Sequence, residues 1–179
     1  MKKSIQIIAV ILLMVASGTF AQNNGDTVKK LAQSIRSHKS LEVSFSYQTV
    51  NDASQPEAAK EGKAYFRDEA YKIIMEDQHA ISDGTTTWHY IVEDEEVMVG
   101  KATDEDNPFK ILDKFERDDS GIQATFDKKG NLKKLEVSVD EGVKLLLEIK
   151  DMKYDEEYSK GFFSFDQKSY PNVELIDMR

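Results

Sequence analysis

Apolar and polar residues alternate with a period of two along many short segments of this chain. In residues 41–47, Leu41, Val43, Phe45 and Tyr47 are separated by single polar residues, and residues 135–139 and 143–149 repeat the pattern. Successive side chains of a strand point to opposite faces, so this alternation predicts strands with one buried face. About ten such strands joined by tight turns would form an antiparallel meander that must curl or close.

The turns between these segments carry their own signals. Asp83-Gly84 precedes an aromatic segment in which Trp88, Tyr90 and Val92 share one face, while His89 points the other way. Phe163 and Phe165 also alternate, which predicts a strand there, and Pro171 marks a turn before a short terminal strand.

Two helices complete the predicted fold. Val28, Leu31, Ala32 and Ile35 recur at helical spacing, so a helix is expected to open the domain and end near His38. A short helix is expected from Pro108 to about Phe115, because proline suits the first helical turn. The sequence therefore predicts a mainly β chain of the α+β class, with a strongly curved antiparallel sheet and a helix against its concave side.

The first residues have the features of a secretory signal peptide. Lys2 and Lys3 precede an apolar core from Ile5 to Val15, and Thr19-Phe20-Ala21 forms a small-residue cleavage site. The apolar run is short for a membrane span, although an uncleaved anchor is the alternative. We expect residues 1–21 to be removed and Gln22–Arg179 to form a single exported domain.

Charge and composition exclude several function classes. The net charge is −9, and removal of a segment with two lysines and no acid makes it −9 − 2 = −11. Such an acidic domain is a poor ligand for nucleic acid or anionic membranes and favours partners with basic surfaces. The chain has no cysteine, so disulfides, thiol chemistry, cysteine-bound zinc and acylation on a cysteine are excluded.

No group of residues has the spacing of a catalytic or metal site. His38, His79 and His89 are scattered, and the acidic clusters at 93–96, 104–106, 118–119 and 155–157 lack the spacing of a calcium loop. Solvated turns are the simplest interpretation of the acids, with a weak calcium site or an acidic docking patch as alternatives. We therefore expect no enzyme activity, no metal and no cofactor.

Aromatic and methionine side chains are concentrated on neighbouring predicted strands. Each of them alone is compatible with plain core packing, but as a group they suit a cavity for alkyl chains, because such side chains adapt to flexible guests. The group comprises Phe45, Tyr47, Phe66, Met75, Trp88, Tyr90 and Met98.

Several short motifs follow one another in a characteristic order. After the first helix and strand come Gly62 to Phe66, Ser82-Asp83-Gly84 with Trp88 and Tyr90, Asn107-Pro108-Phe109 with Ile111-Leu112, and an ending with Tyr170-Pro171, Asp177 and Arg179. In this order, after a signal peptide, they resemble the LolA family of periplasmic outer-membrane lipoprotein carriers, in the branch common among Bacteroidetes-type bacteria. The resemblance covers nearly all of residues 22–179.

This resemblance implies an unclosed β-barrel with helices as a lid and an apolar cavity for lipoprotein acyl chains. The implied partners are acylated lipoproteins, an inner-membrane ABC transporter and an outer-membrane receptor, and the implied carrier is a periplasmic monomer. The residues expected to bind lipid are Phe45, Tyr47, Phe66, Ile73, Met75, Trp88, Tyr90, Val97 and Val99, with Phe109, Ile111 and Leu112 in the covering helix.

The resemblance also suggests a lid latch. Many proteobacterial carriers have an Arg-Pro step after the Gly-led strand, and that arginine ties the lid closed. Arg67 is the candidate here, although Asp68 follows it in place of proline and it lies one position away in the simplest alignment. The alternative function is a periplasmic binding or sensor module of the same shape for a lipid or protein partner.

Overall fold

The computed structural model describes residues 37–51, 58–103, 122–127, 132–140 and 143–179. The described residues include ten strands and one short 3-10 helix, joined by turns and irregular segments: β1 (Leu41–Asn51), β2 (Lys60–Arg67), β3 (Ala70–Met75), β4 (Gln78–Ser82), β5 (Thr86–Ile91), β6 (Glu96–Lys101), β7 (Ile122–Phe126), β8 (Leu132–Asp140), β9 (Val143–Tyr154), η1 (Gln167–Ser169) and β10 (Glu174–Asp177).

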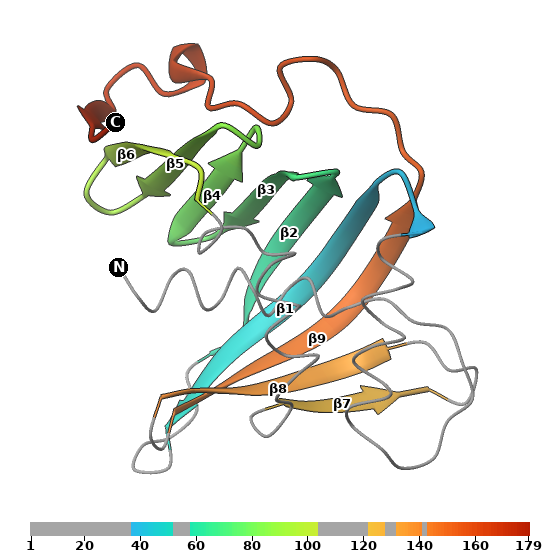
Figure 1. The fold of residues 1–179 in the computed structure, drawn as a ribbon. Helices are drawn as coiled ribbons and strands as arrows, with labels where there is room; N and C mark the ends of the chain where they lie inside the picture. Colours follow the sequence, from blue (N-terminus) through green and yellow to red (C-terminus); the bar gives the residue numbers. More distant parts are fainter. Residues whose placement is uncertain (1–36, 52–57, 104–121, 128–131, 141–142) are drawn as a thin grey trace.

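All ten strands belong to one sheet, in the order β10-β6-β5-β4-β3-β2-β1-β9-β8-β7. Every pairing is antiparallel except that of β10 with β6, which is parallel. The end strands β7 and β10 do not pair with each other, so the sheet is open (Figure 1). The prediction of a mainly β chain with an unclosed antiparallel sheet is confirmed for the described residues.

The sheet twists strongly, so that β7 and β8 run at a steep angle to the strands at its other end (Figure 1). The pairings of β1 with β9, β7 with β8 and β8 with β9 each contain a register shift. A bulge adds one residue to a single strand, which bends that strand and increases its twist. The bulges therefore account for curvature in this half of the sheet.

Local chemistry explains the hairpin between β4 and β5. The Asp83 carboxylate accepts hydrogen bonds from the backbone N–H groups of Thr85 at 2.9 Å and Thr86 at 2.8 Å. Gly84 has a φ of 89°, a region that favours glycine. The Asp-Gly turn predicted from the sequence is confirmed.

The segment 155–173, which we call the strap, contains no strand, so the strand predicted at Phe163 and Phe165 is wrong. These rings pack against the sheet from one side instead of pairing within it. Asp166 caps η1 by accepting a hydrogen bond from the Lys168 N–H at 3.1 Å. The strap leaves the end of β9 and runs along one margin of the sheet towards β6 (Figure 1).

The predicted helices at 28–35 and 108–115, and the predicted signal segment, lie outside the described residues. Within the described ranges, no helix is long and apolar enough to cross a membrane.

One close contact makes glycine necessary in β2. A Cβ atom on Gly62 would lie 2.5 Å from Cζ of Phe45 and 2.7 Å from its Cε2. We expect Gly62→Ala to lower the free energy of unfolding by about 1–3 kcal/mol, because the Phe45 ring must move within a packed face. Gly161→Ala is the matched control: nothing lies within 4 Å of its added Cβ, and its effect should stay within about 0.5 kcal/mol. Equal urea midpoints for the two variants would contradict this account.

Candidate functional site

One face of the sheet carries a continuous apolar surface, which we call the inner face. Its side chains alternate along each strand and meet in register, as in the rung formed by Phe45, Gly62 and Met75. Its buried members are Leu41, Val43, Phe45, Tyr47, Ala64, Phe66, Tyr71, Ile73, Met75, Ala80, Leu132, Leu135, Val137, Leu145, Leu147 and Ile149. The alternation seen in the sequence therefore builds one surface that extends from β4 to β8.

A polar group lies at one margin of the inner face. The Tyr47 hydroxyl donates a hydrogen bond to Oδ1 of Asp77 at 3.1 Å, and the Lys60 ammonium lies 3.3 Å from Oδ2 of Asp77. Burial, followed by the charge of Asp77, raises the pKa of Tyr47, so its phenol stays protonated at neutral pH. At this margin the Tyr47 ring, the Asp77 carboxylate and the Lys60 ammonium therefore lie next to one another.

A second apolar cluster lies on the opposite face, which we call the outer face. Tyr90, Val97, Val99 and Val173 form its buried centre, and Trp88, Val92, Phe165 and Tyr170 pack against it. The expectation that Trp88, Tyr90, Val97 and Val99 share one face with Phe45 and Met75 is therefore wrong. The prediction that Trp88, Tyr90 and Val92 share one face is confirmed.

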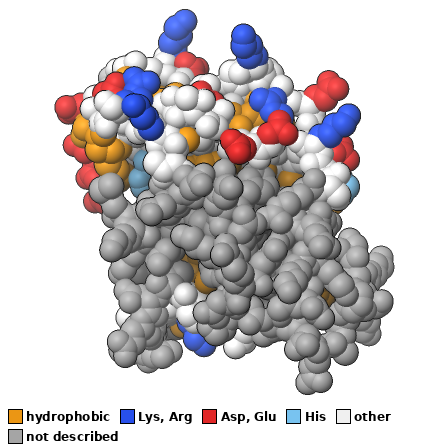
Figure 2. Space-filling model, in the orientation of Figure 1, with side chains coloured by type: hydrophobic (Ala, Val, Ile, Leu, Met, Phe, Trp, Pro, Cys, Tyr) orange, Lys and Arg blue, Asp and Glu red, His pale blue; other side chains and the backbone are white. Residues whose placement is uncertain are grey.

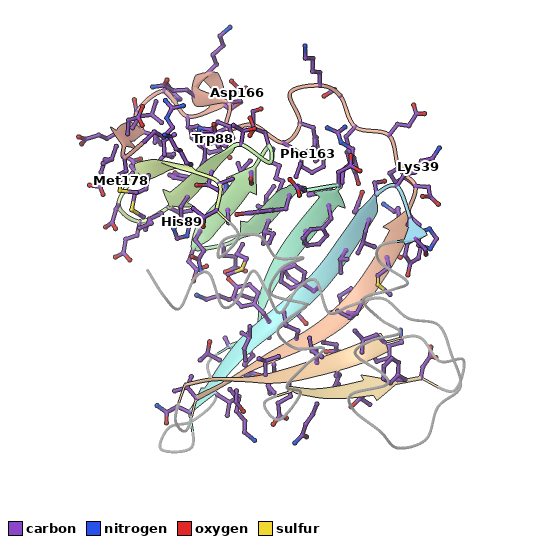
Figure 3. All side chains as sticks on the ribbon, in the orientation of Figure 1. Lys39, Trp88, His89, Phe163, Asp166 and Met178 are labelled. Atoms are coloured by element: carbon purple, nitrogen blue, oxygen red, sulfur yellow. The ribbon has the colours of Figure 1, made fainter. Side chains whose placement is uncertain are left out.

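Strand register explains the separation. Ala80 of the inner face pairs with His89, so His89 lies on the inner face and its neighbours Trp88 and Tyr90 lie on the outer face. Met98 pairs with His89 and lies on the inner face as well. Figure 3 shows Trp88 and His89 on opposite sides of β5. His89 Nε2 lies 3.1 Å from the Gln78 side-chain oxygen.

The strap covers part of the outer face with aromatic rings. Phe163 is 2% exposed, and the Arg67 guanidinium lies over its ring at 4.7 Å from the centroid. Phe162 meets the edge of Tyr65 at 5.0 Å, and Tyr170 contacts Tyr90 at 5.1 Å. Sequence analysis missed this role, although the density of aromatic residues between Tyr158 and Tyr170 was a visible signal.

Polar contacts fix the start of the strap to the start of β1. Asp155 accepts a hydrogen bond from the Lys39 N–H at 2.8 Å, and its other oxygen lies 3.1 Å from His38 Nδ1. The Lys39 N–H and then His38 lower the pKa of Asp155. The Ser40 hydroxyl donates to the Glu156 carbonyl at 2.7 Å.

The remaining predicted site residues separate clearly. Phe45, Tyr47, Phe66, Ile73 and Met75 lie together on the inner face. Phe109, Ile111 and Leu112 lie outside the described residues. Arg67 donates a hydrogen bond to the Tyr158 carbonyl at 3.2 Å on the outer face, so its described contacts are with the strap. Lipid binding by these residues, and the lid latch, stay predictions.

A hollow of about 330 Å³ opens on the outer face of the other half of the sheet. Its lining mixes polar side chains, among them Gln123, Lys134 and Glu148, with leucine side chains, so it offers no wholly apolar surface to an acyl chain. Among the described residues, no group of three or more His, Asp or Glu is placed to hold a metal ion.

Comparisons with known proteins found similarity by structure alone. No family model and no curated protein sequence matches the chain. Similar structures include an uncharacterized conserved protein from Thermus thermophilus, with 4% identity over 78% of this chain and 91% of that chain, at a TM-score of 0.46. A LolA superfamily protein from Nitrosomonas europaea has 8% identity, covers 80% of this chain and 99% of that chain, and has a TM-score of 0.46.

A DUF1329 family protein from Desulfovibrio piger has 12% identity over 78% of this chain and 95% of that chain, with a TM-score of 0.42. The chain resembles these proteins in overall fold alone. At such identities and TM-scores these similarities assign no family and no function, and the resemblance to LolA carriers stays a prediction from the sequence.

A histidine that should respond to pH packs against two rings of the outer-face cluster. His79 packs edge-on against Tyr90 at 5.2 Å and faces Tyr170 at 6.0 Å. Burial, and then the nearby Lys72, lowers its pKa from the ordinary value of 6.5. Between the folded and unfolded pKa values the unfolded chain binds more protons. The contribution of His79 to the free energy of unfolding is therefore fully present above about pH 6.5 and falls as the pH is lowered through that value.

We expect His79→Gln to remove part of this loss. Urea midpoints measured from pH 7.5 to pH 5 should fall less for the variant than for the wild type. Burial also lowers the pKa of His89, so His89→Gln should remove a separate part of the loss. Parallel pH curves for the wild type and His79→Gln would contradict the assignment.

Proposed function

We propose that this protein is a periplasmic carrier that shields lipoprotein acyl chains against its inner face and moves them from the inner towards the outer membrane. The observation that carries the proposal is the continuous apolar inner face, built from alternate residues of neighbouring strands of an open sheet. In this proposal an inner-membrane ABC transporter supplies the acylated cargo and an outer-membrane receptor accepts it. The proposal assigns no catalytic step and no cofactor to any residue.

The physical need for such a carrier comes from the hydrophobic effect. Each methylene exposed to water costs about 0.8 kcal/mol, so a multiply acylated protein does not cross an aqueous compartment unshielded. Met75 and the rings of Phe45 and Phe66 offer polarisable or flat apolar surface, which adapts to flexible chains. Because the sheet is open, its two end strands are not hydrogen-bonded to each other. The two ends of the sheet can therefore move apart, which would help a carrier to release its acyl chains.

One observation favours a second candidate. Val43, Phe45 and Ala64 are fully buried, as in an ordinary packed core. A module with such a core would act through its surface, as a periplasmic sensor or binding protein for a lipid or protein partner. This candidate requires no acyl chain on the inner face.

Two measurements on the intact protein separate these functions. Native mass spectrometry of the protein purified from its own cell envelope should find bound acyl lipid, and added protein should release a lipoprotein from spheroplasts into solution. Lipid-free protein that releases no lipoprotein would contradict the carrier. Binding of a specific protein partner by that lipid-free form would favour the second candidate.

A further inference from the structure

Exposed apolar side chains gather on β10 at the margin of the sheet. Leu175 is 39% exposed, Ile176 36% and Met178 55%, and these are the large exposed apolar side chains of the described residues. Figure 2 shows an apolar patch bordered by acidic side chains at the upper left, where Figure 3 labels Met178. Leu175 pairs with Val97 and Ile176 with Met98, so the two lie on opposite faces of this end strand and apolar side chains are exposed on both sides of the edge.

Among the described residues, no strand pairs with the outer edge of β10. β10 is the last strand at its end of the described sheet. At the two ends of this pairing, the Glu174 N–H donates to the carbonyl of Glu95, just before β6, at 2.9 Å, and the N–H of Met178, just after β10, donates to the Val99 carbonyl at 2.8 Å. In a parallel pair alternate residues bond to the neighbour, so Leu175 and Asp177 direct their N–H and C=O groups away from β6.

Natural sheets protect such edges with short strands, charged side chains, proline or bulges, because an exposed edge adds strands from other chains. β10 is short, and its charged residues are the acids Glu174 and Asp177, which repel an acidic strand but not a basic one. Residues 174–178 contain neither lysine nor proline, and their register with β6 is continuous. The edge therefore has the features that strand addition requires: backbone N–H and C=O groups that point away from β6, and apolar side chains on both faces.

Charge indicates the chemistry of the strand that would add here. Glu174 pairs in register with Glu96, which places two acids side by side on neighbouring strands. Like charges at such positions repel each other. The exposed acids Glu93, Asp94 and Glu95 form the turn just before β6. Asp177 is already paired with Arg179, whose Nη2 lies 2.6 Å from its carboxylate.

We propose that β10 is a docking edge for an extended segment of a partner protein in which basic and apolar residues alternate. Basic side chains would lie beside Glu174 and Glu96, with their alkyl stems along Ile176, and apolar side chains would lie beside Leu175. A second copy of this chain is disfavoured, because its own β10 would bring acids to acids on a chain of net charge −9. The docking edge does not depend on acyl binding and goes beyond the carrier function.

The test measures fluorescence anisotropy with two labelled, end-blocked peptides, one alternating lysine and valine and the other glutamate and valine. The intact protein should bind the lysine peptide, more weakly as salt rises. The glutamate peptide should bind at least about tenfold more weakly, a difference of about 1.4 kcal/mol.

Two substitutions locate the site. Leu175→Pro removes an outward N–H and leaves the Glu174 and Met178 hydrogen bonds to β6 in place, and Leu175→Lys introduces a repelling charge. Each should weaken binding of the lysine peptide about tenfold or more. Gln123→Lys on β7, the strand at the other end of the sheet, adds the same charge and should leave binding unchanged. Circular dichroism checks that each variant is folded.

Three results would overturn the proposal. The first is equal affinity for the two peptides, and the second is unchanged affinity in both Leu175 variants. The third is a concentration-dependent dimer in sedimentation velocity that Leu175→Lys abolishes, which would assign the edge to a second copy of this chain.

Discussion

Replacement of Met75 by glutamate is expected to remove acyl binding and to lower the free energy of unfolding by about 3–5 kcal/mol, the range for an uncompensated buried charge. Met75 is 3% exposed on the inner face, opposite Gly62 in the register. A carboxylate there has lost its water, so burial should raise its pKa. Relative to the wild type, which carries the same histidines, the variant should therefore gain stability as the pH is lowered from 8 to 5.

Ile74→Glu is the matched control, because Ile74 is the neighbour of Met75 on β3 and lies half-buried on the outer face. It should keep acyl binding. The measurements are urea denaturation at several pH values and titration with a fluorescent diacylated peptide, made on protein shown to be folded. If Met75→Glu does not fold, Met75→Ala provides the binding comparison with Ile74→Ala. Equal acyl affinity for the inner-face and outer-face variants would contradict binding at the inner face.

Phe163→Ala should destabilise the protein by about 3–5 kcal/mol, the usual range for removing a buried phenylalanine ring. The ring is buried between the Arg67 guanidinium and the edges of Tyr158 and Phe162, at centroid distances of 5.4 and 5.1 Å. Its loss leaves a cavity under the strap, so the strap should open locally more often. Trypsin should then cleave faster at the exposed residues Lys160 and Lys168.

Phe162→Ala is the control for this effect, because Phe162 belongs to the same ring cluster but is only half-buried. Its loss of stability should be clearly smaller than that of Phe163→Ala. Mass spectrometry of the early tryptic fragments locates the first cleavage. An unchanged cleavage rate in a destabilised Phe163→Ala variant would show that the ring stabilises the sheet and not the strap.

The positions of the strands could be predicted closely from the sequence. Residues 41–47 lie within β1, residues 143–149 lie within β9, and the terminal strand after Pro171 is β10. These segments are long enough for their period of two to be unmistakable, and burial of one face then selects the strand conformation. The Asp83-Gly84 turn was equally predictable, because the Asp83 side chain and the positive φ of Gly84 act within a few residues.

The division of the candidate site into two faces could not be predicted in this way. Alternation shows that Trp88 and Tyr90 share a face of their own strand, but it does not relate that face to the face of Met75. The pairing of Ala80 with His89 decides this relation, and a shift of one residue would have exchanged the two faces.

The strap shows that an alternating pattern can also occur without a strand. Phe163 and Phe165 alternate as strand residues do, yet the chain around them pairs with no strand, and the rings pack onto the outer face. The short-range sequence pattern determined which side chains become buried and the period at which they recur along the chain. Tertiary structure decided which surfaces bury them, because register and cross-sheet packing join residues far apart in the chain, and no local pattern contains those pairings.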